Sequence, residues 1–418
     1  MNEYEESRIF KEKIMKDKKS SALLVLIAAV AINVFNGVMY TWSSISSKII
    51  SEWGWTSKEA SLPYTTYTVF FVVSMVAFGE TMDKKGPKGL ATLGSILLGL
   101  GFLLSGFTKN PAIMVITIGI IMGSGVGMHT LTTAPAAIKW FPPEKKGLVT
   151  GIVSSGVAAS SLIFSPIGKY LLDKIGVNNT FILLGGVLMV VTTVFSRMLK
   201  NPATQIIAEE PKDSLLDFEV SYDWKYMLKT TYFYKLWIMM AFLSASGLMI
   251  ISHIVNISKV QAGLDNGYIL IIFLSIFNFM GRILAGMFSD KLGRINLLKI
   301  ILILEAINIG FFRMYSNLGL LIIGVGIVGF CYGAVFSVFP SAISDKYGPK
   351  FYGKNYALIF TSWGLSGIIG PMTAAAIFDI TGGYEAAYLI ALFLLIISSL
   401  IAFGIKEKNE QKESLVES

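Results

Sequence analysis

Apolar stretches of about 20 residues recur along nearly the whole chain, and short polar or charged segments separate them. Each stretch is long enough to cross a bilayer as one helix, since a span needs about 20 predominantly apolar residues. The first covers roughly 21–46, the last covers roughly 386–403, and twelve can be distinguished. The pattern therefore predicts an all-α polytopic membrane protein with twelve transmembrane helices.

The region 199–230 interrupts this pattern, because it is polar, mixes acidic and basic residues and contains no spanning stretch. We interpret it as a linker that allows the two halves of the chain to move relative to each other. The predicted organisation is an N-tail (1–20), an N-terminal six-helix bundle (21–198), the linker (199–230), a C-terminal six-helix bundle (231–404) and a C-tail (405–418).

A charged turn occurs twice, as GETMDKKGPK at 79–88 and as GMFSDKLGRI at 286–295. Both copies have the form G-x-x-x-D-K-x-G, and their aspartates are 207 residues apart, about half of the chain. The repeat predicts two pseudo-symmetric bundles. A carboxylate at a helix end can pair with a neighbouring helix end or a cation. We therefore predict a gating role for Asp83, Lys84, Asp290, Lys291 and Arg294.

Composition agrees with a membrane protein, since 54% of the residues are hydrophobic and only 15% are charged. Of the 35 Lys and Arg residues, 27 fall in the tails and in the even-numbered connections between spans. By the positive-inside rule, both termini are expected to be cytoplasmic, in a multi-pass protein of the cell (plasma) membrane. This distribution explains the net charge of +8 by contact with anionic lipid, so nucleic acid is not an expected partner. The single cysteine, Cys331, excludes an internal disulfide.

One basic residue, Arg282, is predicted to lie deep inside a span. It precedes Asp290 by eight residues, or about 12 Å along a helix, and half of a hydrocarbon core is about 15 Å. Such a charge is costly unless it faces protein or a watery cavity. Asn278 lies one turn earlier on the same face. We predict that both residues bind an anion, because a guanidinium matches a carboxylate; the alternative is that Arg282 pairs with Glu305 of the ninth span.

Further candidates for the binding site lie on the first and fourth spans. Asn36 and Tyr40 belong to a polar face of the first span with helical spacing. On the fourth span, only His129, Thr130 and Thr133 are expected to be able to contact solute. Hydrogen bonding between helices, with no ligand, is the alternative for these polar positions.

Aromatic residues complete the predicted pocket. Tyr332 and Phe336 of the tenth span and Trp363 of the eleventh, together with Tyr40, would surround a short acyl chain; the alternative is that they serve only as packing residues. Two titratable residues are candidates for proton coupling. They are His253, whose unperturbed pKa of about 6.5 suits physiological switching, and Glu305; for each, a purely structural role is the alternative.

Four segments of the chain resemble the oxalate/formate antiporter family and its monocarboxylate transporter relatives, within the major facilitator superfamily. They are NGVMYTW (36–42), KWFPPEKKGLVTG (139–151), FMGRILAGMFSDKLGR (279–294) and FPSAISDKYGPKFYGKNYA (339–357). The resemblance implies two six-helix halves that enclose a midplane solute site and rock about it. It also implies that Arg282 contacts the substrate carboxylate, and related bacterial lactate transporters have an Asn at the position of Asn278.

The chain departs from these families at two positions. Oxalate exchangers carry a second cation in the eleventh span, where this chain has Trp363. One cation balances one carboxylate, which favours a monocarboxylate. The animal relatives have an Asp at the position of Asn278, so that form of proton coupling is not expected here.

We hypothesise a secondary transporter of small monocarboxylates of the formate, acetate, lactate or pyruvate type, working by proton symport or by anion exchange. The alternatives are a transporter of oxalate, sugar, nitrate or drugs and, more remotely, a membrane sensor. No enzymatic activity, cofactor or metal is expected, since no nucleotide-binding motif, metal cluster or nucleophile triad occurs. The expected partners are the bilayer, a small organic anion and a proton if transport is coupled to one, and the protein is expected to be monomeric.

Overall fold

The computed structural model describes residues 3–202, 221–264 and 267–405, and it describes side chains from residue 20 onward. Most of the predicted linker and nearly all of the predicted C-tail lie outside these residues. Within them, eleven helices are long and apolar enough to cross a membrane.

The N-terminal half contains helices α1 to α7. The long helices are α1 (Glu3–Asn36), α3 (Ser57–Lys85), α4 (Pro87–Ser105), α6 (Gly123–Ile138) and α7 (Lys146–Ser196), and the short ones are α2 (Trp42–Trp53) and α5 (Pro111–Met114). Three further segments connect them: the 3₁₀ helices η1 (Gly37–Thr41) and η3 (Pro143–Lys145), and the π-helical η2 (Val115–Met122) between α5 and α6.

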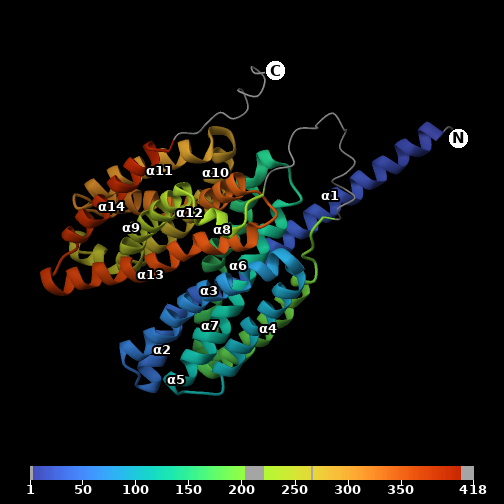
Figure 1. The fold of residues 1–418 in the computed structure, drawn as a ribbon. Coiled ribbons are helices and arrows are strands. Elements are labelled where there is room, and N and C mark those ends of the chain that lie inside the picture. The colour runs from blue at the N-terminus through green and yellow to red at the C-terminus, as the bar shows by residue number, and fades with distance from the viewer. Residues whose placement is uncertain (1–2, 203–220, 265–266, 406–418) are drawn as a thin grey trace.

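The C-terminal half contains α9 (Thr231–Ala262), α10 (Tyr268–Leu292), α11 (Arg294–Phe312), α12 (Leu318–Tyr347), α13 (Tyr352–Thr381) and α14 (Glu385–Phe403). It is preceded by the short helix α8 (Trp224–Met227). Figure 1 shows the two halves as separate groups of helices that meet on one side of the molecule.

Helix α7 explains the difference between eleven long helices and twelve predicted spans. Its 51 residues would measure about 76 Å if helical throughout, more than twice a hydrocarbon core of about 30 Å. Gly176 breaks it with φ of 75°, a conformation that glycine adopts readily. The two parts, 146–175 and 177–196, form the fifth and sixth spans, so the predicted all-α architecture with twelve spans is confirmed.

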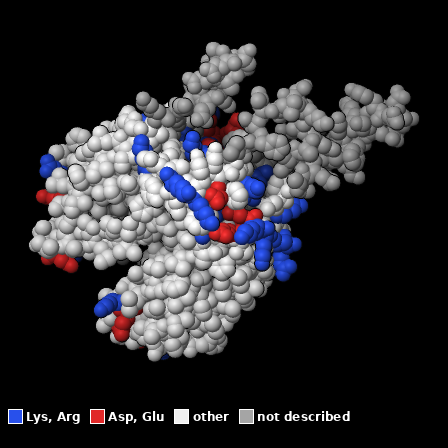
Figure 2. Space-filling model, in the orientation of Figure 1, with Lys and Arg blue, Asp and Glu red and all other residues white. Residues whose placement is uncertain are grey.

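We call the end of the molecule at which α1 enters and α14 ends the terminal face. The connections at 86, 139–145, 293 and 348–351 lie there, and Lys, Arg, Asp and Glu gather over this region while most of the remaining visible surface is uncharged (Figure 2). We call the opposite end the distal face. The halves touch near the terminal face and diverge towards the distal face (Figure 1).

Candidate functional site

A cavity of about 440 Å³ lies between the two halves. Both halves contribute to its wall. The lining contains eight residues that the sequence predicted to bind substrate: Asn36, Tyr40, Thr130, Asn278, Arg282, Tyr332, Phe336 and Trp363. Arg282 is the one charged residue among the described residues of this lining.

The Arg282 side chain is 2% exposed and is held by neutral groups. Its Nε donates to Asn278 Oδ1 (2.9 Å), one turn earlier on α10, as helical spacing predicts. Its Nη1 donates to the backbone oxygen of Ser154 on α7 (2.9 Å), which belongs to the other half. Among the described residues it has no acidic partner, so the alternative pairing with Glu305 does not occur. The guanidinium therefore retains an uncompensated positive charge at the cavity wall.

An aromatic wall surrounds this charge. The Phe336 ring stacks on the guanidinium, with Cζ 4.1 Å from the ring centroid, a favourable cation–π geometry. Trp363 Nε1 donates to the Tyr332 hydroxyl (2.9 Å), which leaves the proton of that hydroxyl free to be donated elsewhere. Trp363 also contacts Phe71 of α3 edge-on at 5.3 Å, so the wall continues across both halves.

The sequence interpretation missed several aromatic residues of this wall. They share helical spacing on α3 and α13 with residues already named, and they are Tyr64, Tyr67, Phe71, Tyr356 and Phe360. The available signal was three rings within two turns of each span, at i, i+3 and i+7 on α3 and at i, i+4 and i+7 on α13, because both spacings place the rings on one helix face.

The N-terminal half contributes a polar network to the opposite wall. Asn33 Nδ2 donates to Thr133 Oγ1 (3.0 Å), and both residues line the cavity with Thr130. His129 does not reach the cavity, because it is fully buried and its Nδ1 lies 2.7 Å from Asn36 Oδ1. The expectation that His129 could contact solute was therefore wrong. The ring packs against α4 instead, where its Nε2 contacts Ser95 and Ala91.

The two proton-coupling candidates lie outside the cavity lining. His253 is behind one wall, with Nε2 at 3.2 Å from the backbone oxygen of Pro371, which is itself a lining residue. Glu305 is 1% exposed on α11, and its Oε2 has no hydrogen-bond partner among the described residues. The sequence predicted that Glu305 lies near the middle of its span, but it did not predict which face of the helix carries it.

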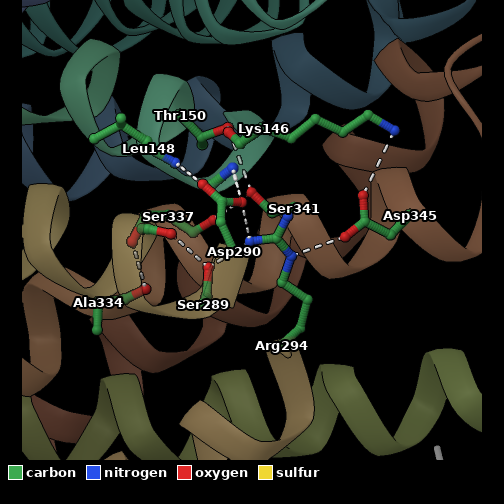
Figure 3. A network of polar contacts seen from close by, with 12 residues as sticks. Lys146, Leu148, Thr150, Ser289, Asp290, Arg294, Ala334, Ser337, Ser341 and Asp345 are labelled. Atoms are coloured by element: carbon green, nitrogen blue, oxygen red, sulfur yellow. Dashed lines mark hydrogen bonds and ion pairs between the residues drawn. The ribbon is translucent and has the colours of Figure 1, made fainter. Parts of the chain in front are cut away.

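On the terminal face, α10 of one half caps α7 of the other (Figure 3). Asp290 accepts the backbone N–H groups of Gly147 and Leu148, both at 2.8 Å. These amides belong to the first turn of α7, where they have no partner within the helix. Arg294 Nη1 lies 2.6 Å from Asp290, and its Nε donates to Asp345 (2.8 Å). We call this contact region the α7–α10 seam.

The repeated motif makes the equivalent contact on the other side. Asp83 accepts the backbone N–H groups of Gly353 (2.7 Å) and Lys354 (3.0 Å) in the first turn of α13. Lys354 Nζ also donates to the backbone oxygen of Val76 on α3 (2.7 Å). Desolvation lowers the pKa of the nearby half-buried Lys139, and the Asp83 carboxylate offsets part of that shift. We call this contact region the α3–α13 seam.

The two lysines predicted to act in gating lie away from these contacts. Lys84 pairs with Glu80 on its own helix (3.5 Å) and is exposed. Lys291 is exposed at the end of α10. The two aspartates therefore bond directly across the halves. Arg294 holds Asp290 and Asp345 within the C-terminal half, and Lys146 of α7 pairs with Asp345 across the seam (3.5 Å). The lysines next to the aspartates take no part in these contacts.

Glycines allow the backbones to approach at both seams. A Cβ atom at Gly286 would clash with the backbone oxygen of Gly147, and one at Gly353 would lie 2.7 Å from Asp83 Oδ1. Deeper in the α7–α10 seam, a Cβ atom at Gly151 would clash with the backbone oxygen of Arg282. Among the described residues, no group of three or more His, Cys, Asp or Glu could hold a metal ion.

Comparison with solved structures shows the same fold in known transporters. The fucose:proton symporter of Escherichia coli superposes with a TM-score of 0.72 at 13% identity, covering 93% of this chain and all of that chain. A structure of the same symporter in the outward conformation gives a TM-score of 0.69. At this identity, the likeness concerns the fold alone.

Sequence comparison identifies the family. A family model described as Major Facilitator Superfamily matches residues 23–307 and 250–418. The oxalate:formate antiporter of Oxalobacter formigenes is 25% identical over 387 residues, covering 91% of this chain and 89% of that protein. Monocarboxylate transporter 13 of Rattus norvegicus is 23% identical over 325 residues, covering 75% of this chain and 72% of that protein. This chain is a multi-pass membrane transporter, not an enzyme, and it belongs to the Major Facilitator Superfamily.

Proposed function

We propose that the protein is a secondary transporter of small monocarboxylate anions that works by alternating access of the central cavity. The observation that carries this proposal is Arg282, an unpaired guanidinium at the wall of a cavity shared by both halves. A charge at this depth costs about 2.5 to 3.5 kcal/mol on insertion scales. An anionic substrate offsets that cost, and a guanidinium can hold a carboxylate with two hydrogen bonds.

The surroundings of Arg282 favour one carboxylate over two. The described lining offers one positive charge. By the resemblance to oxalate exchangers, Trp363 occupies the position of their second cation. Aromatic rings beside the guanidinium suit a short apolar tail. The names of two relatives, an oxalate:formate antiporter and a monocarboxylate transporter, support small carboxylates as the substrate class.

We assign the terminal face to the cytoplasm of the cell (plasma) membrane, because most Lys and Arg lie in the tails and in the connections there. Both termini are then cytoplasmic, and the distal face, towards which the two halves diverge, is on the outside (Figure 1). The domain boundaries proposed from the sequence, at 21–198 and 231–404, place each seam between the two halves. We further propose that the monomer is the working unit, because the cavity is built from one chain.

Uptake by purified protein in liposomes tests the proposal. Radiolabelled formate, acetate, lactate and pyruvate are offered separately, and at least one is expected to accumulate above protein-free liposomes. Arg282→Gln is expected to abolish that uptake. Arg313→Gln, on the exposed end of α11, is the matched control and should leave uptake unchanged. Full uptake by Arg282→Gln would remove Arg282 from the binding role.

Competition experiments distinguish the alternative substrates. Unlabelled monocarboxylates should compete, whereas a sugar, nitrate or an uncharged drug should not. Competition by neutral solutes alone would favour a different transporter class. Binding without any net or exchange flux would favour a sensor.

The coupling ion is tested by imposing a pH gradient. If transport is proton symport, acidifying the outer medium should raise uptake. The increase should be smaller in the variant, His253→Gln or Glu305→Gln, that replaces the proton-carrying residue. If transport is anion exchange, preloading the liposomes with unlabelled substrate should raise uptake at any pH, and neither substitution should alter this effect.

A further inference from the structure

The polar network of the N-terminal half contains one imidazole, His129, whose contacts define the orientation of a neighbouring amide. The ring is fully buried in α6. Its Nδ1 faces Asn36 Oδ1 at 2.7 Å, and its Nε2 faces Ser95 Oγ at 2.9 Å. Gly94 leaves room for the ring, since a Cβ atom there would lie 2.9 Å from His129 Cδ2. The ring is therefore locked in position by α1 and α4.

The contact between Nδ1 and the Asn36 amide oxygen favours one tautomer. An amide oxygen only accepts hydrogen bonds, so Nδ1 must carry a proton to bond with Asn36. Nε2 can then accept from the Ser95 hydroxyl at 2.9 Å. The Ala91 backbone oxygen, 2.9 Å from that hydroxyl and 3.1 Å from Nε2, competes for the hydroxyl proton and is the acceptor that the other tautomer would use. The groups that contact the ring, from Asn36 on α1 and from Ala91, Gly94 and Ser95 on α4, are all uncharged.

The same bond fixes the amide of Asn36. With Oδ1 taken by His129, the Nδ2 group points to the other side, where its one hydrogen bond among the described residues is a long contact of 3.5 Å to Asn33 Oδ1. At that length the bond is weak. Asn36 lines the same cavity as Arg282 but comes from the N-terminal half, at the point where α1 changes into the 3₁₀ helix η1. An amide N–H is thus left available at the cavity wall.

We propose that His129 is a positioning residue: it donates Nδ1–H to Asn36 and thereby presents the Asn36 amide as a hydrogen-bond donor to the transported anion. The anion is then held by both halves, by Arg282 from the C-terminal half and by Asn36 from the N-terminal half. This inference rests on the proposed function. A substrate that contacts both halves stabilises their closure around it, because a ligand shifts a conformational equilibrium only through differential contacts.

A spectroscopic arm tests the orientation without any substrate. The chain contains two histidines, so ¹⁵N-histidine labelling with His253→Gln leaves one imidazole to observe. The proposal expects a proton on Nδ1 of His129 throughout pH 5.5 to 8, with a resonance that shifts in Asn36→Ala. A proton on Nε2 alone, or no response to Asn36→Ala, would overturn it whether or not the protein transports carboxylates.

Uptake kinetics test whether His129 affects substrate binding. The substrate is the radiolabelled monocarboxylate from the uptake panel that the unaltered protein accumulates fastest. His129→Leu is expected to raise KM about ten- to a hundred-fold at similar Vmax, the effect of losing a hydrogen bond to a charged ligand. His129→Asn, which can retain a donor near Nδ1, is expected to restore KM to within a few-fold. The double variant of His129→Leu with Asn36→Ala should be no worse than Asn36→Ala alone, because His129 acts through Asn36.

Three transport results would contradict the proposal. They are an unchanged KM in His129→Leu, additive effects in the double variant, and a loss in both His129 variants of a pH dependence that the unaltered protein shows. The last result would make His129 a proton carrier. Failure of Arg282→Gln to reduce uptake is a separate outcome, which would refute the proposed function and leave the spectroscopic result on His129 intact.

Discussion

Asp290→Asn should weaken the closed terminal face. In the structure the carboxylate accepts two backbone N–H groups from the first turn of α7, at 2.8 Å each, and it is 7% exposed. Asparagine retains one acceptor oxygen and places an NH₂ group against the second N–H. The substitution therefore removes one charge-assisted hydrogen bond across the halves and reduces the other to a neutral one.

The size of the effect follows from these two bonds. Hydrogen bonds to a charged group contribute about 1.5 to 3 kcal/mol each, and a neutral one contributes about 1 kcal/mol. The expected loss is about 3 kcal/mol, or about a hundred-fold in the ratio of conformers closed at the terminal face to those open there. The bond between Asp290 and Arg294 lies within one half, so it does not enter this difference.

Distances between spin labels on the distal face measure that ratio. Labels on Ser51→Cys and Glu385→Cys, both exposed, report the separation of the halves in lipid nanodiscs. The buried native thiol is removed with Cys331→Ala. Asp290→Asn should increase the short-distance population relative to the long-distance one by about a hundred-fold.

Matched variants isolate the cause. Lys291→Gln alters the neighbouring exposed charge, has no contact with α7 to lose, and should leave the distances unchanged. Asp83→Asn removes the equivalent cap at the α3–α13 seam and should act to a similar extent. The two aspartates share no partner among the described residues, so their effects should add. A shift below threefold for Asp290→Asn, or one matched by Lys291→Gln, would refute the helix-cap explanation.

Three further substitutions test the cavity and the seam. Trp363→Lys adds a second cation beside Arg282, so dicarboxylates such as oxalate should begin to compete in uptake assays; unchanged selectivity would contradict the one-charge argument. Gly151→Val places a side chain against the backbone of Arg282, so the label pair should show at least a tenfold loss of the long-distance population. Phe336→Leu removes the ring that covers the guanidinium and should raise KM up to about tenfold, the range of one cation–π contact. It should destabilise the protein no more than other core substitutions do.

Hydropathy was enough to predict the spans, and the place of Arg282 within an apolar stretch was enough to predict its depth. Both depend on local properties, namely the length of an apolar stretch and the depth of a residue within it. The pairing of Asn278 with Arg282 was also predictable, because i and i+4 neighbours on a helix meet regardless of the tertiary fold.

Partners on other helices were not predictable in the same way. The repeated motif indicated that Asp83 and Asp290 stand at helix ends, but the amides that they cap lie about 140 or 270 residues away in the sequence. The depth of Glu305 gave no information about its rotation around α11. His129 was placed in the cavity for the same reason, since a residue on a polar stretch can face a neighbouring helix as well as a ligand.

The anion site and the closure of the terminal face lie on one stripe of α10. Arg282, Gly286 and Asp290 follow each other at four-residue intervals, and they contact Ser154, Gly147 and the first turn of α7. Because a helix rises about 1.5 Å per residue, the guanidinium and the capping carboxylate are separated by only about 12 Å of rigid helix. Separation of α7 from α10 at the terminal face would therefore also withdraw the Ser154 oxygen from Arg282. We expect the carboxylate of a bound anion to replace that lost acceptor on Arg282. The anion should therefore stabilise the conformation in which the seam is open more than the conformation in which it is closed.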